Sequence, residues 1–288
     1  MPLFSIIIPV FNRSKILSTA IDSVLKQSYQ DYELVIVDDG SQDNTREVVQ
    51  TFNDPRIKYI YQENKGVCAA RNTGISNAEG FYITFLDSDD KVEPEWLNDF
   101  YQFSINKTAD IVFCDMKVYI WDGRVKVNKA QFRYNKEANN NGMFMPGTFC
   151  IQSELLKSFG GFDERIRFGE FTDMDFILQD RSIIRSFTNK VGLHYYPALN
   201  GGGRNQNNKI EALKYLLNKH AGHFKKNKNS KRLYLQNIAV SYLRMNNFSQ
   251  ARIYFLKSFF INPFMLKTLL RLILSFSPYF SKKIWKFS

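Results

Sequence analysis

Three aspartates follow directly after a short apolar stretch, and their types and spacing could hold a metal ion. The stretch at residues 81–86 reads FYITFL, and Asp87, Asp89 and Asp90 come immediately after it. A β-prone run of this kind predicts a strand buried on both faces. Burying an unpaired carboxylate is costly, so we expect the strand to end at water or at a cation. Carboxylates at positions i and i+2 can converge on one hard divalent ion, although an isolated DxD is more often a solvated turn.

A second acidic pair occupies the same kind of position. Residues 33–37 (ELVIV) form another apolar run, and Asp38 and Asp39 follow it. The chain up to Leu86 alternates strand and helix patterns, which predicts a Rossmann-like, mostly parallel central sheet flanked by helices. Ligands of such open α/β sheets bind beyond the carboxyl ends of the strands. Both acidic segments are therefore predicted to lie at one binding site.

Composition and cysteine usage fit a folded protein of a reducing compartment. The 288 residues are 44% hydrophobic and 15% aromatic, which excludes a disordered chain. Cys68, Cys114 and Cys150 form an odd, sparse set without a CxxC pair, so no disulfide framework is expected. The apolar run at the amino terminus is too short for a signal peptide or a spanning helix. We expect a cytoplasmic protein without a transmembrane segment.

The charge of the chain changes sharply near residue 209. From Lys209 onward there are 16 basic residues and one acid, although the whole chain carries a net charge of only +11. We therefore divide the chain into a body at residues 1–208 and a basic, helical C-terminal appendage at residues 209–288. The predicted last helix, residues 264–276, has one polar stripe on an apolar cylinder and is followed by SPYFSKKIWKFS.

Basic residues interleaved with aromatics suit a surface that rests on an anionic membrane, on its cytoplasmic face. The alternative is an apolar stripe packed on the body and a solvated basic tip. We find no base-reading motif in the tail and expect no nucleic-acid partner. A dinucleotide oxidoreductase is excluded too, because PVFNRS stands where GxGxxG is required after the first strand.

Five ordered segments of this chain resemble the inverting family 2 glycosyltransferases of GT-A fold. The segments are FSIIIPVFNR, ELVIVDDGSQDNT, NKGVCAARNTGI, FYITFLDSDD, and GGFDE followed by an acid-rich helix start, and they cover roughly residues 3–200. The resemblance implies transfer of a sugar from a nucleotide donor, most commonly UDP-linked. It also implies a glycan or lipid-linked acceptor in cell-surface polysaccharide assembly.

The resemblance implies a divalent Mn or Mg ion at the three aspartates. Asp89 is the main candidate ligand, Asp87 assists through the ribose or the metal shell, and Asp90 caps or orients the turn. A divalent ion there would neutralise charge on the leaving diphosphate. His194, on the predicted last strand, is a further candidate ligand, although a lone strand histidine is more often structural.

Nucleotide contacts are implied at the ends of the first two strands and on the helix that follows the third. Asp39 is expected to accept the uracil imide N–H, whereas Asp38 pairs with backbone amides of its own turn. Pro9 and Phe11 are expected to frame the base. Arg71 is expected beside the base and the diphosphate, with a surface salt bridge as the alternative.

Inversion requires one base that deprotonates the acceptor hydroxyl opposite the leaving nucleotide. Relatives present Glu-Asp followed two residues later by Asp, and the matching stretch here is GEFTDMD. Aligning the last acid with Asp175 places the base at Asp173 and Thr172 where Glu is customary. Glu170 is the alternative base, and Asp173 as a helix N-cap is the structural alternative. The departure at Thr172 also keeps open a catalytically degenerate sugar-nucleotide-binding protein that acts as a partner module.

Overall fold

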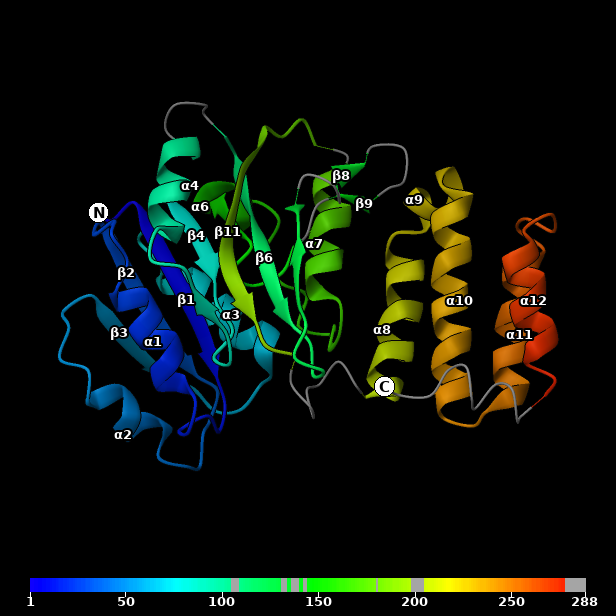
Figure 1. Cartoon of the computed structure of the whole chain (residues 1–288), viewed down its shortest axis with the longest axis horizontal. Coiled ribbons are helices and arrows are strands. Elements are labelled where there is room, and N and C mark those ends of the chain that lie inside the picture. The colour runs from blue at the N-terminus through cyan, green and yellow to red at the C-terminus, as the bar shows by residue number, and fades with distance from the viewer. Residues whose placement is uncertain are drawn as a thin grey trace. The chain divides into compact units, whose positions relative to one another are not determined.

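The chain folds into two compact units (Figure 1). One unit comprises residues 1–165 and 170–199, and the other comprises residues 166–169 and 200–288. The structure, a computed structural model, describes residues 1–104, 109–130, 134–135, 140–141, 144–179, 181–197 and 205–277. Parts of the polar segment at residues 126–147 and nearly all of the basic, aromatic tail, residues 278–288, lie outside the described part.

The first unit is built on one nine-stranded sheet in the order β3-β2-β1-β4-β10-β6-β11-β5, with β7 paired to β6. The four strands β3, β2, β1 and β4 are parallel, whereas β10 runs antiparallel between β4 and β6. The predicted α/β class is confirmed. The strands are β1 (Phe4–Val10), β2 (Tyr32–Asp38), β3 (Ile57–Tyr61), β4 (Tyr82–Phe85), β5 (Lys91–Val92), β6 (Ile111–Tyr119), β7 (Val125–Asn128), β10 (Phe149–Gln152) and β11 (Arg185–Tyr195), with β8 (Tyr134–Asn135) and β9 (Asn140–Asn141) in a separate pair.

Helices cover both faces of this sheet (Figure 1). They are α1 (Leu17–Leu25), α2 (Thr45–Gln50), α3 (Val67–Asn77), α4 (Trp96–Ser104), α6 (Ser153–Lys157) and α7 (Glu170–Gln179). Strand β1 shows why its sequence is apolar throughout, because it is buried on both sides. Ile6 and Ile8 pack with α1 and α4 in one core, and Ile7 packs with α3 and α7 in the other.

Two residues shape the centre of the sheet: a glycine lets helix α3 pack closely on β1, and a proline lies near the end of β1. A Cβ at Gly74 would collide with the side chain of Ile7, so the small residues of α3 let this helix lie directly on β1. Pro9 has no N–H to donate, and it lies in β1 beyond Ile7, the last β1 residue paired with β4. The sheet therefore opens at the carboxyl ends of β1 and β4.

The second unit consists of helices α8 (Gln206–Lys219), α9 (Ala221–Lys226), α10 (Lys228–Arg244), α11 (Phe248–Phe259) and α12 (Leu266–Leu274). Three of them begin at an asparagine, Asn205, Asn227 or Asn247, whose side chain accepts from the backbone N–H three residues on. Its core includes Phe255 and Leu272. Among the described residues, no helix is long and apolar enough to span a bilayer.

Candidate active site

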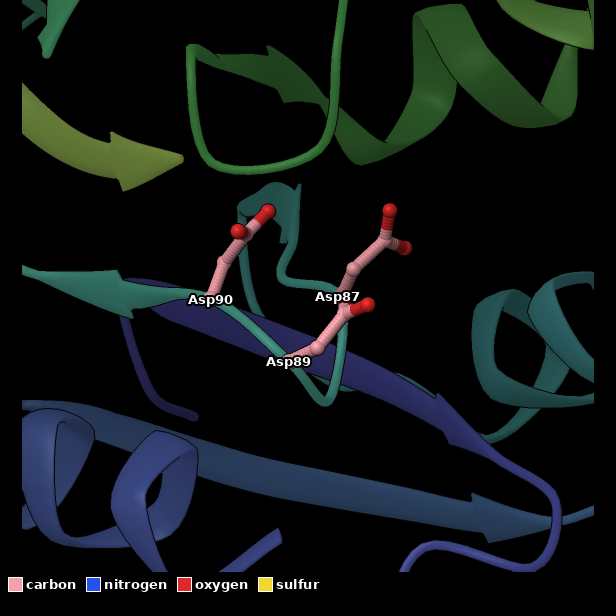
Figure 2. Close-up of side chains that lie close together, drawn as sticks. All are labelled: Asp87, Asp89 and Asp90. Carbon is pink, nitrogen blue, oxygen red and sulfur yellow. The ribbon is translucent and has the colours of Figure 1, made fainter. Parts of the chain in front are cut away.

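The three predicted aspartates meet at the end of β4. The last backbone hydrogen bond between β4 and β1 runs from Leu86 N to Ile7 O, at 3.0 Å. Asp90 N donates to Asp87 O at 3.1 Å and closes the turn that follows. One carboxylate oxygen from each of Asp87, Asp89 and Asp90 lies within 4.8 Å of the others. Figure 2 shows the three side chains on the short loop between β4 and β5. We call them the carboxylate group.

The electrostatics of the carboxylate group favour a cation. Asp90 is 3% exposed and accepts a hydrogen bond from Tyr196 N at 2.9 Å. Burial, with Asp87 and Asp89 as further causes, raises the pKa of Asp90 to about 8. Burial also raises the pKa of Asp87, together with Asp89 and against the opposing effect of Arg71. Several hard oxygen donors that repel one another form a fitting set for Mg²⁺ or Mn²⁺.

Arg71 joins the carboxylate group to helix α7. Its guanidinium donates to Asp87 Oδ1 at 3.0 Å through Nη2 and to Glu170 Oε1 at 2.7 Å through Nη1. The side chain is 3% exposed, its Cζ lies 4.7 Å from the Phe171 ring centroid and 5.6 Å from that of Phe162, and its Nε has no hydrogen-bond partner. The surface salt bridge considered from the sequence is therefore wrong, because this ion pair is buried at the site.

Asp39 organises the loop that follows β3. It is 4% exposed, and its oxygens accept from Gln62 Nε2 at 2.7 Å, Lys65 N at 2.9 Å and Gly66 N at 2.8 Å. Gly66 has a φ of 96°, which favours glycine, and directly precedes α3. A carboxylate offers about four acceptor positions, so about one remains for a ligand N–H.

Asp38 has the structural role that we predicted. Its Oδ1 accepts from Ser41 N at 2.7 Å, within its own turn, and its Oδ2 accepts from the Tyr59 hydroxyl at 2.7 Å. Phe11 is 43% exposed just beyond the end of β1, whereas Pro9 is buried within that strand. Asn12 N donates to Ser41 Oγ at 2.9 Å, which ties the segment after Phe11 to the turn after Asp38. An exposed aromatic residue thus directly precedes Asn12, which contacts the turn after Asp38 and Asp39.

The acids of α7 are distributed around the helix. The helix begins at Glu170, so Asp173 is inside its first turn and the N-cap alternative is wrong. Asp173 is 2% exposed and lies about 60° around the helix from Glu170. Asp175 lies about 140° from Glu170, and burial raises its pKa to about 7. Glu170 and Asp173 therefore share a side of the helix that Asp175 does not.

His194 has hydrogen-bond partners other than the carboxylate group. Its Nε2 lies 2.7 Å from Glu93 Oε1, and its Nδ1 lies 2.7 Å from the Tyr119 hydroxyl. Both ring nitrogens are occupied, so coordination of a metal would require one of these bonds to open. The structure thus gives His194 a structural role between β6 and the segment after β5.

The sequence predicted most of these residues but not their connections. It identified Asp90 only as a capping residue, although the DSDD spacing already allowed a third oxygen donor. It also treated Arg71 and Glu170 as members of separate motifs. These two residues are 99 positions apart, and only the fold brings them together.

Comparisons with known proteins agree with this arrangement. The model of the family "Glycosyl transferase family 2" matches residues 5–164. The chain is 44% identical over 113 residues to glycosyltransferase GlyG of Streptococcus pneumoniae, covering 38% of each protein. It is 35% identical over 187 residues to an uncharacterised glycosyltransferase of Rickettsia typhi, covering 61% of this chain and 58% of the relative. It is 45% identical over 97 residues to a chondroitin synthase of Escherichia coli, covering 33% of this chain and 14% of the relative.

A solved structure shows the same fold over nearly the whole chain. The S. aureus TarS fragment in complex with UDP-GlcNAc superimposes with a TM-score of 0.64 at 23% identity, covering 94% of this chain and 79% of that one. This chain spans less than two thirds of the length of each curated relative named above. The family match nevertheless covers more than half of the chain. The protein therefore belongs to glycosyl transferase family 2 and has the GT-A fold.

Proposed function

We propose that this chain is a metal-dependent, inverting glycosyltransferase whose donor is a nucleotide sugar, and that the nucleotide is UDP. One observation carries the proposal. Arg71 connects Asp87 of the carboxylate group to Glu170 at the start of α7, which links the candidate metal site to the helix that carries both candidate bases. A solvated turn would not need a buried arginine to link it to acids far along the chain.

The donor assignment rests on the Asp39 loop. The remaining acceptor position of Asp39 suits the uracil imide N–H. The exposed ring of Phe11, just beyond the end of the neighbouring strand β1, offers an apolar surface for the base. Pro9 is buried within β1, so we propose that it supports the base site by shaping the end of this strand and not by direct contact. The solved structures of TarS with UDP-GlcNAc and with UDP support a uridine nucleotide.

Asp89 and Asp87, with Asp90 as a third donor, would hold a Mg²⁺ or Mn²⁺ ion. Such an ion supplies Lewis-acid neutralisation of the diphosphate as the sugar leaves. Asp90 is anchored by Tyr196 N, and Asp87 by Arg71, so two of the three side chains are fixed before any ligand arrives. That fixed geometry lowers the reorganisation needed during the reaction.

Asp173 is our candidate for the base that takes the proton of the acceptor hydroxyl, on the face opposite the leaving nucleotide. Glu170 is the alternative. Its ion pair with Arg71 suits it better to holding the arginine in place than to moving a proton. Because Asp173 lies one helical turn further on, it shares the orientation of Glu170.

We assign this chemistry to residues 1–208, and to residues 209–288 a contact with an anionic membrane surface on its cytoplasmic face. The acceptor we propose is a glycan or a lipid-linked glycan of cell-surface polysaccharide assembly. The similarity to a chondroitin synthase supports a polysaccharide acceptor. The strongly basic composition of the appendage supports the membrane contact.

The test is hydrolysis of UDP-sugars by the purified full chain, with Mn²⁺ or with EDTA. We expect Mn²⁺-dependent turnover that Asp89→Ala lowers by roughly a hundredfold or more, with an unchanged melting curve. Asp122→Ala is the matched control, because Asp122 lies in an exposed turn and pairs only locally with Arg124. UDP binding without any turnover would instead favour a degenerate, sugar-nucleotide-binding protein, to which the departure at Thr172 points.

A further inference from the structure

Helix α12 directs its apolar side away from the core of its own unit. The exposed residues recur at Leu266, Leu270 and Ile273, the spacing of one helical stripe, and are 67%, 48% and 56% exposed. Phe264 just before the helix is 95% exposed, and Phe276 just after it is 63% exposed. We call these five residues the apolar face of α12.

The opposite side of α12 is buried, and beside the core residue Leu272 it carries polar side chains. Thr268 is fully buried, and its hydroxyl accepts from Gln236 Nε2 at 2.7 Å and from Arg232 Nη1 at 3.2 Å, both on α10. Arg271 donates to Gln236 Oε1. Ser275 is also buried, at 1% exposure. The polar stripe predicted for the last helix therefore faces inward at Thr268 and Ser275, a direction that the sequence alone did not predict.

This polar network fixes the rotation of α12 about its axis. Turning the helix so that Leu270 and Ile273 faced inward would leave Arg232 and Gln236 buried without Thr268 as their partner. An unsatisfied buried donor is costly, and a charged one more so. The exposed apolar face is thus a consequence of satisfied hydrogen bonds beneath it, and not of a loosely packed helix. Contiguous exposed apolar residues of this kind mark interaction surfaces.

The charge around this face selects its partner. The chain from Lys209 onward carries 16 basic residues and one acid. Arg252 lies against the face, with its Cζ 5.0 Å from the Phe276 ring centroid. A second copy of this chain would bring the same positive charge to the contact and be repelled. An anionic lipid surface complements both features, because it attracts the basic residues and accepts the apolar side chains.

We infer that the apolar face of α12 inserts into the interfacial region of an anionic bilayer. This inference deepens the membrane contact under the proposed function, and it names the side chains that make the contact. Basic residues near the headgroups supply attraction, and the leucine, isoleucine and phenylalanine side chains supply burial. The buried network of Thr268 keeps the apolar face in position for insertion.

Flotation of the full chain with vesicles tests this inference. The vesicles contain phosphatidylcholine alone, or phosphatidylcholine with about 30% phosphatidylglycerol, which gives the surface a negative charge like that of a natural anionic membrane. We expect binding to the anionic vesicles only. The double variant Leu270→Glu/Ile273→Glu should bind at least about tenfold more weakly, because two apolar side chains lose burial and negative charge is added.

A matched control is Leu233→Glu, because Leu233 is 43% exposed on α10 and outside the apolar face. We expect the control to float like the parent. A neutral pair, Leu270→Gln/Ile273→Gln, should also weaken binding, which separates lost burial from added charge. Equal melting temperatures show that the variants fold.

Three results would overturn the inference: no flotation of the parent, equal flotation of the double variant and the control, or a concentration-dependent self-association that the double variant abolishes. UDP-sugar hydrolysis is measured in the same samples. A chain that floats but does not hydrolyse the donor would contradict the proposed function and leave the membrane inference intact.

Discussion

Replacing Arg71 with methionine removes the cation between two acids while keeping an apolar stem of similar length. The parent guanidinium is 3% exposed and pairs with Asp87 at 3.0 Å and Glu170 at 2.7 Å. It also stacks against Phe171, and methionine retains part of that contact. The substitution therefore tests the charge more than the packing, and it leaves two carboxylates facing each other without a counter-ion.

Removing one partner of a buried ion pair costs about 3–5 kcal/mol. Asp87 is 36% exposed at its side chain, so water screens part of that cost, whereas Glu170 at 16% is screened less. We expect a loss of about 2–3 kcal/mol, which in a unit of this size lowers the melting temperature by roughly 4–12 °C.

The loss should depend on pH, because burial already raises the pKa of Asp87 and Arg71 opposes that rise. Without Arg71 the folded-state pKa moves further above the unfolded value. The free energy of unfolding of the variant is then greatest at low pH, where Asp87 is protonated in both the folded and the unfolded state, and it falls as pH rises. The penalty of Arg71→Met is therefore expected to be larger at pH 8 than at pH 4.5.

Thermal unfolding followed by circular dichroism at both pH values, in EDTA, measures this difference. Arg124→Met is the control, because Arg124 forms an ion pair with Asp122 in an exposed turn, and we expect its melting curve to match the parent. Two results would refute a stabilising role of the Arg71 ion pairs: a melting temperature of Arg71→Met within error of the control, or a loss of stability that becomes smaller as pH rises.

Three further substitutions test the acids of the site. Asp173→Asn should lower kcat by roughly a hundredfold or more without changing UDP affinity by calorimetry, since it removes a proton acceptor and not a nucleotide contact; that pattern in Glu170→Gln alone would make Glu170 the base. Asp90→Asn should raise the melting temperature in EDTA at pH 8 but not at pH 4, because burial raises the pKa of Asp90 to about 8 and its ionised form opposes folding as pH rises toward that value. Saturating Mn²⁺ should stabilise the parent more than this variant, and equal stabilisation would argue against Asp90 as a third ligand.

Strands β1, β2 and β4 could be predicted from the sequence because each lies in an apolar run that is almost entirely buried. Ile6, Ile7 and Ile8 all contact core residues, so β1 shows no alternation that could be mistaken for a surface strand. β5 and β10 were not predicted. β5 has two residues, and β10 has four, inserted antiparallel between β4 and β6 by pairing that no local pattern records.

In the site, too, features of the local sequence could be predicted, whereas contacts between distant segments could not. The acids at strand ends are local signals, and Asp38, Asp87 and Asp89 were recognised from them. The partners of Asp39 and Arg71 depend on chain segments that meet only in the fold, such as Gly66 N and Glu170. Periodicity likewise located both stripes of α12, but the inward direction of the polar one depends on α10, which supplies Arg232 and Gln236 as its partners.

The proposed function also explains why an anionic donor would bind beside a cluster of acidic side chains. Asp87, Asp89 and Asp90 repel one another and, when ionised, would repel a diphosphate as well. Arg71 offsets part of this charge, and Asp87 and Glu170 each take one of its five N–H groups. One guanidinium does not balance the four carboxylates around it. A divalent cation held by the carboxylate group would supply the positive charge that a diphosphate requires. The three acids would then hold the cation, while Arg71 keeps Asp87 and Glu170 in place.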